Sequence, residues 1–287
     1  MLRQRIITAL LLAPLALGAI LFLPLFGFEV AIGLIVGLGA WEWAQLAGIQ
    51  NRIGKALYSL LLVVICAALS SYIPVELIWY QGQLAALYRT ILAIAGVWWA
   101  LSLLMIVAYP KYSTLWRSNM LLRGIFGLLT LVPTWVAIVS LRTYLYDIDP
   151  LFGASLIFYV LGIVWAADIG AFFIGIKFGK HKLRPNVSPG KTYEGLMGGV
   201  MSSLAIIGFA ALHYQVDPTR IWTHILIGAL TVGVSALGDL NESMYKRCVG
   251  VKDSGNLLPG HGGILDRIDS LTAAFPIFAL FYVMWMA

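Results

Sequence analysis

The sequence has 287 residues, of which 61% are hydrophobic and 11% charged, whereas soluble domains carry roughly 45–50% apolar and about 25% charged residues. So few charged side chains cannot cover a soluble domain of this length. An ordinary globular protein is therefore excluded, and lipid must cover much of the surface.

Nine stretches have the roughly 20 mostly apolar residues that a helix needs to cross the hydrocarbon core. They lie near 6–24, 27–47, 56–73, 90–108, 123–141, 152–176, 195–213, 222–240 and 270–286. The first stretch is longer than a signal-peptide core, so we predict that it is retained. The predicted fold is all-α and integral to the membrane, a polytopic bundle of about nine transmembrane helices in a single domain spanning 1–287.

The loops predict the orientation, because short cytoplasmic loops carry an excess of Lys and Arg. With a cytoplasmic N-terminus, 16 of the 19 Lys and Arg residues fall inside, and only Arg89, Arg142 and Arg220 fall outside. The net charge of +6 is therefore mostly a consequence of topology and requires no nucleic-acid partner.

The two halves of the chain differ in polarity. Residues 1–150 are mainly hydrophobic helices, whereas 151–287 contain the two longest charged loops, so the catalytic half is expected there. The first loop ends in the run Ser188 to Thr192, which lacks the upstream glycine of a P-loop. We predict a Pro-Gly turn that presents Lys191 before a helix whose N-terminal end favours anions. Topology or contact with anionic headgroups is the alternative explanation for such a basic loop.

The second loop is flanked by two polar helix faces. Helical spacing places Asp239, Glu242, Ser243 and Lys246 on one face, and Asp266, Asp269 and Ser270 on another. Carboxylates within membrane spans, such as Asp168, Asp239 and Asp266, are expensive and mark functional sites, although structural ion pairs are the alternative. Carboxylates from two helices can hold Mg²⁺, which shares its ligands with substrate phosphates. Cations nearby could neutralise a triphosphate, namely Lys191, Lys246, Arg247, Lys252 and Arg267. The pattern therefore favours phosphoryl or nucleotidyl transfer.

Two features outside these loops have simpler explanations. Glu42 stands between two tryptophans near the cytoplasmic end of the second span, so we expect an interfacial anchor, with a functional role as the alternative. Glycines four residues apart predict helix packing rather than catalysis; they are Gly33/Gly37, Gly175/Gly179 and Gly195/Gly199.

The run from Ser243 to Asp269 resembles the signature of the bacterial phosphatidate cytidylyltransferase family, also called CDP-diacylglycerol synthases. It reads Ser-x-x-Lys-Arg, four residues, Lys-Asp-x-Gly, three residues, then Pro-Gly-His-Gly-Gly-x-x-Asp-Arg-x-Asp, without a departure. Ser188 to Thr192, Asp168 and the multi-helix layout are also similar to that family.

The resemblance implies a multi-pass enzyme of the bacterial cytoplasmic (inner) membrane with a cytoplasmic N-terminus and active site. It would join CTP to phosphatidic acid, giving CDP-diacylglycerol and pyrophosphate in phospholipid biosynthesis, with Mg²⁺ as cofactor and room for a second cation. Membrane lipids would be further partners, and the glycine pairs leave a homodimer open. The implied metal ligands are Asp239 and Asp266, and the implied catalytic residues are Lys191, Lys246, Lys252, Asp266 and Arg267. The substrate-binding set is Asp168, Ser188, Gly190, Lys191, Thr192, Glu242, Ser243, Arg247, Asp253, His261, Gly262, Gly263 and Asp269.

Three alternatives to this function stay open. The nearest is a related membrane cytidylyltransferase that uses another lipid phosphate, or a CTP-dependent polyprenol kinase. An ion-coupled transporter is a rival of another class, but the polar residues crowd one face of the membrane instead of meeting at its middle. A structural scaffold would not explain two loops that combine carboxylates, cations and glycines.

Overall fold

The computed structural model describes residues 2–286, without the side chains of residues 2–7 and 9. Nine long helices and one short one account for most of these residues. They are α1 Leu2–Phe22, α2 Leu25–Ala47, α3 Arg52–Tyr72, α4 Ala86–Ala108, α5 Thr114–Arg117, α6 Met120–Thr143, α7 Phe152–Phe178, α8 Tyr193–His213, α9 Ile221–Val249 and α10 Leu265–Trp285. Two 3₁₀ helices, η1 Val75–Leu77 and η2 Pro218–Arg220, and two antiparallel hairpins are the other described elements. The hairpins are β1 Trp79–Tyr80 with β2 Gln83–Leu84, and β3 Lys182–Arg184 with β4 Ser188–Thr192.

Eight of the described helices are long and apolar enough to cross a membrane. They are α2, α3, α4, α6, α7, α8, α9 and α10. The chain is thus an all-α, multi-pass membrane protein, as predicted. The ninth predicted span, 6–24, falls on α1, whose apolar part Leu10–Phe22 is shorter and whose first side chains lie outside those described, so this span stays a prediction.

Local residues set several helix ends. Gly48 follows α2 with a φ of 101°, and Gly250 follows α9 with a φ of 73°, a left-handed conformation that glycine adopts without a steric penalty. Asn51 caps α3 by accepting a hydrogen bond from the Gly54 N–H, and Asn119 caps α6 by accepting one from the Leu122 N–H. These caps satisfy backbone donors that the first helical turn leaves unpaired.

The helix α9 continues well beyond its predicted end at residue 240, to Val249. The apolar pattern stops near Asp239 because the last turns carry charged and polar side chains. Several of these point into the protein, since Asn241, Glu242 and Tyr245 are buried. A helix needs only its own backbone hydrogen bonds, so it can continue where the hydropathy signal ends.

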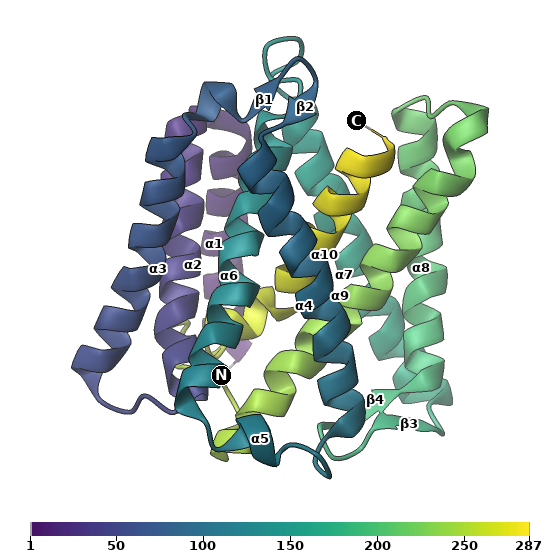
Figure 1. The fold of residues 1–287 in the computed structure, drawn as a ribbon. Helices are drawn as coiled ribbons and strands as arrows, with labels where there is room; N and C mark the ends of the chain where they lie inside the picture. Colours follow the sequence, from purple (N-terminus) through teal and green to yellow (C-terminus); the bar gives the residue numbers. More distant parts are fainter. Residues whose placement is uncertain (1, 287) are drawn as a thin grey trace.

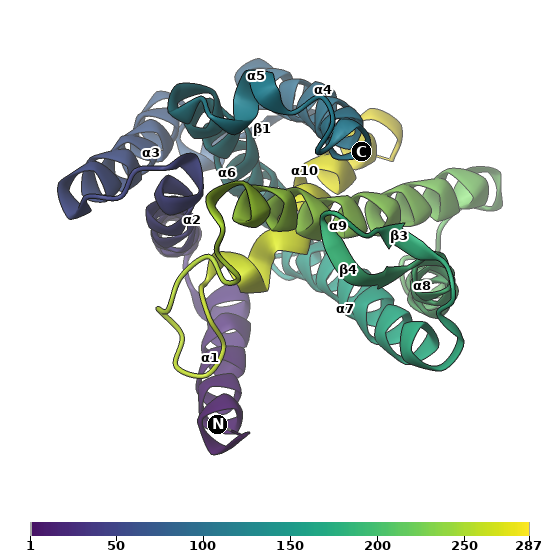
Figure 2. The same ribbon diagram turned by 90° about the horizontal axis from the view of Figure 1, so that it is seen from below.

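The helix α10 lies at the centre of the bundle. It packs against α9, α6, α4, α7 and α2. Figure 2 shows α9 running across the molecule, with α10 passing behind it. The elements α2 to α6 lie on one side of α9, and α7, α8 and the β3–β4 hairpin lie on the other. Two groups of helices therefore meet along the α9–α10 pair.

The charged connections gather at one end of the bundle. In Figure 1 the α2–α3 turn, α5, the β3–β4 hairpin and the α9–α10 loop all lie at the lower end. The β1–β2 hairpin and the α6–α7 and α8–α9 connections lie at the upper end. Helix alternation thus places the two loops singled out in the sequence at the same end of the bundle.

Candidate active site

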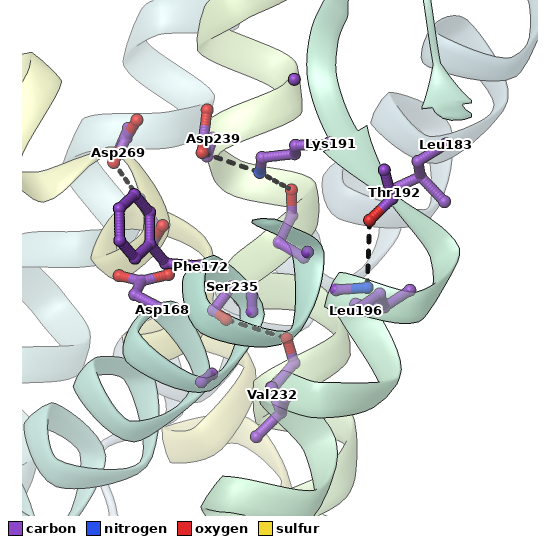
Figure 3. A pocket seen from close by; sticks show the side chains of 18 of the residues that line it. Asp168, Phe172, Leu183, Lys191, Thr192, Leu196, Val232, Ser235, Asp239 and Asp269 are labelled. Carbon is purple, nitrogen blue, oxygen red and sulfur yellow. Dashed lines mark hydrogen bonds and ion pairs between the residues drawn. The ribbon is translucent and has the colours of Figure 1, made fainter. Parts of the chain in front are cut away.

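A cavity of about 600 Å³ opens between α7, β4, α8, α9 and the start of α10. Four carboxylates line it, Asp168, Asp239, Asp266 and Asp269, and among its described lining residues Lys191 is the sole basic one. Figure 3 shows Lys191 directed at Asp239, with Asp168 and Asp269 also facing the pocket. The cavity therefore joins residues that are up to about 100 positions apart in the chain.

Lys191 is the electrostatic centre of this cavity. Its Nζ lies 2.7 Å from Asp239 Oδ2 and donates to the Ala236 carbonyl at 3.3 Å. The ammonium also attracts the carboxylates of Asp168 and Asp269, whereas Asp239 repels both. One cation thus faces several anions, which leaves the cavity with an excess of negative charge.

A second ion-pair cluster borders the cavity at the foot of α9. Lys246 Nζ lies 2.8 Å from Asp266 Oδ1 and 3.1 Å from Glu242 Oε1. Asp266 also accepts hydrogen bonds from the N–H groups of Ser254 and Gly263. The Glu242 side chain is only 2% exposed, and truncating one partner of such a buried pair would leave the other charge uncompensated.

The loop between α9 and α10 is held against the first turn of α10 by hydrogen bonds. Gly260 and Gly262 adopt positive φ values of 77° and 84°, which glycine tolerates and other residues rarely adopt. Arg267 donates two hydrogen bonds to the His261 carbonyl, at 3.1 and 2.8 Å. The glycine-rich turn is therefore fixed against the first turn of α10.

Glu42 reaches this loop from α2, which corrects its prediction as an interfacial anchor. Its side chain is 2% exposed and accepts hydrogen bonds from the N–H groups of Ile264 and Leu265 and from Ser254 Oγ. The carboxylate thus satisfies backbone donors at the N-terminal end of α10, where a negative charge is also favoured by the helix dipole.

The predicted Pro-Gly turn around Gly190 is wrong in form, because Ser188–Thr192 is a strand. Ser188 lies opposite Arg184, and Thr192 lies opposite Lys182. The chain reverses earlier, where the buried Val187 donates to the Arg184 carbonyl. The strand nevertheless leads directly into α8, with Thr192 as its cap, so Lys191 still precedes a helix N-terminus.

The predicted site residues separate into three groups. The cavity is lined by Asp168, Gly190, Lys191, Thr192, Asp239, Asp266 and Asp269. Residues that contact these, or that form the loop beside them, are Glu242, Ser243, Lys246, Gly262, Gly263, His261 and Arg267. The remaining four neither line the cavity nor make a described side-chain contact with a lining residue; they are Lys252 and Asp253 in the α9–α10 loop, and Ser188 and Arg247 at the β3–β4 hairpin and the end of α9. Of these, Arg247 donates to the Val187 carbonyl and so braces the β3–β4 hairpin.

Residues 3–285 of the chain match the sequence profile described as the Cytidylyltransferase family. The chain belongs to this family. A phosphatidate cytidylyltransferase of Pseudomonas aeruginosa is 45% identical over 287 residues, covering 100% of this chain and 98% of that protein. One from Haemophilus influenzae is 41% identical over 98% of this chain and 99% of that protein. One from Staphylococcus haemolyticus is 34% identical over 65% of this chain and 78% of that protein.

The oxygen donors of this cytidylyltransferase fit the magnesium that the resemblance implies. No three described His, Cys, Asp or Glu side chains are grouped tightly enough to hold an ion by themselves. Mg²⁺ commonly takes only one or two carboxylates and completes its shell with waters and substrate phosphates. A cavity with four carboxylates and one lysine would repel a triphosphate unless a cation accompanied it. The donor set therefore suits an ion shared with the substrate.

Sequence reasoning missed two kinds of contributor to the site, side chains on the cavity wall and a residue that supports the neighbouring loop. The wall includes apolar and small side chains of α7 and α9, such as Phe172 and Ser235. Their helical spacing relative to Asp168 and Asp239 was the available signal, because residues three or four apart share a helix face. The role of Glu42 had no such signal, since its hydrogen-bond donors lie over 200 residues further along the chain.

Proposed function

We propose that the chain transfers the cytidylyl group of CTP to phosphatidic acid, giving CDP-diacylglycerol and pyrophosphate. The observation that carries this proposal is the carboxylate-rich cavity with Lys191, bordered by the signature loop. Two relatives matched over their whole length are named for the same reaction. The nearest alternatives, another lipid-phosphate cytidylyltransferase or a CTP-dependent polyprenol kinase, share the metal and phosphate chemistry and differ in the lipid acceptor or in the group transferred.

In the proposed reaction, a phosphate oxygen of phosphatidic acid attacks the α-phosphorus of CTP. The new P–O bond forms as the bond from the α-phosphorus to the bridging oxygen of the β-phosphate breaks, and pyrophosphate leaves with that electron pair. The attacking oxygen is already anionic at neutral pH, so the step requires no general base. Positioning and charge neutralisation then supply most of the rate enhancement.

We assign roles to the residues from their contacts. Lys191, whose ammonium lies between Asp239 and the Ala236 carbonyl, would bind a phosphate of CTP. Asp239 would hold Mg²⁺ with at most one further carboxylate of the cavity, such as Asp168 or Asp269, and the ion would neutralise the triphosphate oxygens. Asp266 would ligate the ion as the sequence predicts only by giving up a hydrogen bond, because Lys246 and two backbone N–H groups already occupy its oxygens.

The same proposal places the site at the cytoplasmic face of a bacterial inner membrane, with a cytoplasmic N-terminus. The end of the bundle with the signature loop also has most Lys and Arg, as the positive-inside rule requires of a cytoplasmic side. CTP would therefore reach the cavity from the cytosol, level with the lipid phosphate.

The test is product formation by the purified chain in detergent with labelled CTP, phosphatidic acid and Mg²⁺. We expect Asp239→Asn to lower kcat at least roughly a hundredfold, the scale of a lost electrostatic contact in the transition state. The control is Asp217→Asn, which changes an exposed carboxylate outside the cavity and should leave kcat unchanged. A folded Asp239→Asn enzyme with normal kcat would exclude the assigned site. A folded, lipid-supplemented wild type that makes no CDP-diacylglycerol, but that modifies a polyprenol or another lipid phosphate, would exclude the acceptor.

A further inference from the structure

A second cavity, of about 580 Å³, lies away from the carboxylate cavity and shares no lining residue with it. Its walls come from the α2–α3 turn, α5, the first turn of α6 and the end of α9, and they include Arg117, Ser118 and Arg123. Figure 2 shows α5, α6 and the end of α2 on one side of α9, with the β3–β4 hairpin, α7 and α8 on the other. The proposed reaction uses none of these residues.

Arg123 is the feature of this cavity that needs an explanation. It is 7% exposed, and its buried Nε has no hydrogen-bond partner. Within the described part of the chain, no carboxylate forms an ion pair with it. The effective penalty for burying an ion is several kcal/mol, so buried charges are normally paired. The guanidinium therefore borders the cavity without a carboxylate partner among the described residues, and an anion bound there would offset the cost of burying it.

The helix ends around the cavity do not supply that anion. Gly48, which caps α2, and the last residues of α9 reach it, and both helix C-termini carry a partial negative charge. That charge is worth up to about 2 kcal/mol in a partly buried geometry, less than the several kcal/mol that burying an ion costs. The described hydrogen bonds include none from the guanidinium to these carbonyls, although Gly48 lies so close that a Cβ there would be 2.8 Å from Nη2.

The other groups in the cavity suit a phosphate. Arg117 adds a second guanidinium, and Thr114 and Ser118 add hydroxyl donors. Guanidinium groups bind phosphate through paired hydrogen bonds, which makes arginine a frequent phosphate ligand. The buried Arg123 and the exposed Arg117 could therefore both donate hydrogen bonds to one phosphate group.

The surface beside the cavity indicates a lipid as the source of that phosphate. Leu115 on α5 is 79% exposed, and Leu121 on α6 is 71% exposed. Exposed apolar side chains at the end of a membrane-spanning bundle lie at the depth where headgroups meet acyl chains. We propose that this cavity binds the phosphate of an anionic membrane-lipid headgroup, with Arg123 as its main ligand and the acyl chains against α5 and α6.

The test measures binding of dioleoylphosphatidylglycerol to the purified full chain in neutral detergent by native mass spectrometry. We expect Arg123→Gln to weaken binding roughly tenfold, the effect of losing a hydrogen bond to a charged group, and Arg117→Gln to weaken it roughly threefold. Arg52→Gln is the matched control, because Arg52 is exposed at the same end of the bundle but does not line the cavity. It should bind as the wild type does.

Every outcome decides the proposal. Unchanged binding by folded Arg123→Gln, or equal loss in all three variants, would overturn it. If the wild type binds inorganic phosphate in a way that Arg123→Gln abolishes, but binds no dioleoylphosphatidylglycerol, a soluble anion is the ligand and the lipid is overturned. If Arg123→Gln does not fold, the comparison of Arg117→Gln with Arg52→Gln decides, and equal binding by those two would count against the site.

Discussion

Glu42 illustrates how a single buried side chain can position a distant loop. Its carboxylate accepts from the Leu265 N–H at 2.7 Å and the Ile264 N–H at 3.2 Å, at the point where α10 begins. Asp266, one residue further on, anchors Lys246 and the loop. Moving this N-terminus would therefore displace the carboxylates that face the proposed substrates.

We predict that Glu42→Gln lowers kcat more than it raises the KM for CTP. The amide can present its NH₂ group to backbone N–H donors, and a buried donor left unsatisfied costs about 1–3 kcal/mol. A displaced active-site loop should lower kcat by at least roughly tenfold, given that a 1 Å misplacement can cost about a hundredfold. The measurement is steady-state kinetics with detergent-purified enzyme of confirmed fold.

Gln45→Ala provides the control for that experiment. Gln45 lies one turn further along α2, and its side chain accepts from Lys55 Nζ at a half-buried position, away from the loop. Its removal should leave kcat unchanged. Normal kcat in folded Glu42→Gln enzyme would contradict a positioning role and leave Glu42 as a purely structural residue.

Among single residues, the sequence predicted those that line the cavity better than those that support the neighbouring loop. All of the predicted residues Asp168, Lys191, Asp239 and Asp269 line one cavity. They could be predicted because carboxylates within membrane spans and a lysine beside a glycine stand out in an apolar sequence. Glu42 was misread because the flanking tryptophans suggest a membrane interface. Hydrogen bonds between residues 222 positions apart leave no trace in local spacing.

The packing of α7 against α8 depends on glycines at the contact. A Cβ at Gly199 would lie 2.8 Å from the Ala167 carbonyl oxygen, and one at Gly195 would lie 2.9 Å from that of Ala171. Real Cβ atoms do not approach backbone oxygens so closely, so a larger residue must push the helices apart. The predicted packing role of the pair Gly195/Gly199 is confirmed.

We predict that Gly199→Ala destabilises the protein by about 1–3 kcal/mol, the usual cost of overpacking. The shift would also move Asp168, the neighbour of Ala167, and so reduce activity. Gly208→Ala on the same helix is the control, because nothing lies within 4 Å of its added Cβ. Thermal unfolding in detergent should show a lower Tm for Gly199→Ala alone. Equal Tm values for the two variants would contradict the close contact.

Whole elements were predictable where the hydropathy pattern was long. Most of the predicted spans overlap the observed helices to within a few residues. The end of α9 was underestimated because its polar face turns inward. The β3–β4 hairpin was not anticipated because its strands are short and polar, and because pairing between Lys182 and Thr192 is fixed by tertiary context rather than by a residue pattern.

At the scale of the whole molecule, the bundle separates its charges between two ends. Arg89, Arg142 and Arg220, the basic residues assigned to the outside, lie on or next to the ends of α4, α6 and α9 that are at the top of Figure 1. The Lys- and Arg-rich connections lie at the opposite end, with the signature loop. The end of the bundle at which each connection lies thus agrees with the side of the membrane that its charge predicts. These are independent properties of the sequence, one set by the number of helices and the other by the Lys and Arg content of the loops.

This arrangement predicts the labelling of cysteines placed at the two ends. In a chain whose Cys66 and Cys248 are replaced by serine or alanine, Asp147→Cys and Arg52→Cys each introduce one exposed thiol. We expect a membrane-impermeant maleimide to label Asp147→Cys on intact bacterial spheroplasts, since the α6–α7 connection would face outward. Arg52→Cys should react only after lysis, because the positive-inside rule places the α2–α3 turn in the cytoplasm.

The cysteine-free chain should stay unlabelled before and after lysis, which controls for background reaction. The reverse labelling pattern would place the carboxylate cavity outside the cell, where CTP is absent, and the proposed cytidylyl transfer could not occur there. The two thiols thus report on function as well as topology, because a cavity built for a cytosolic nucleotide must open on the side where Arg52 lies.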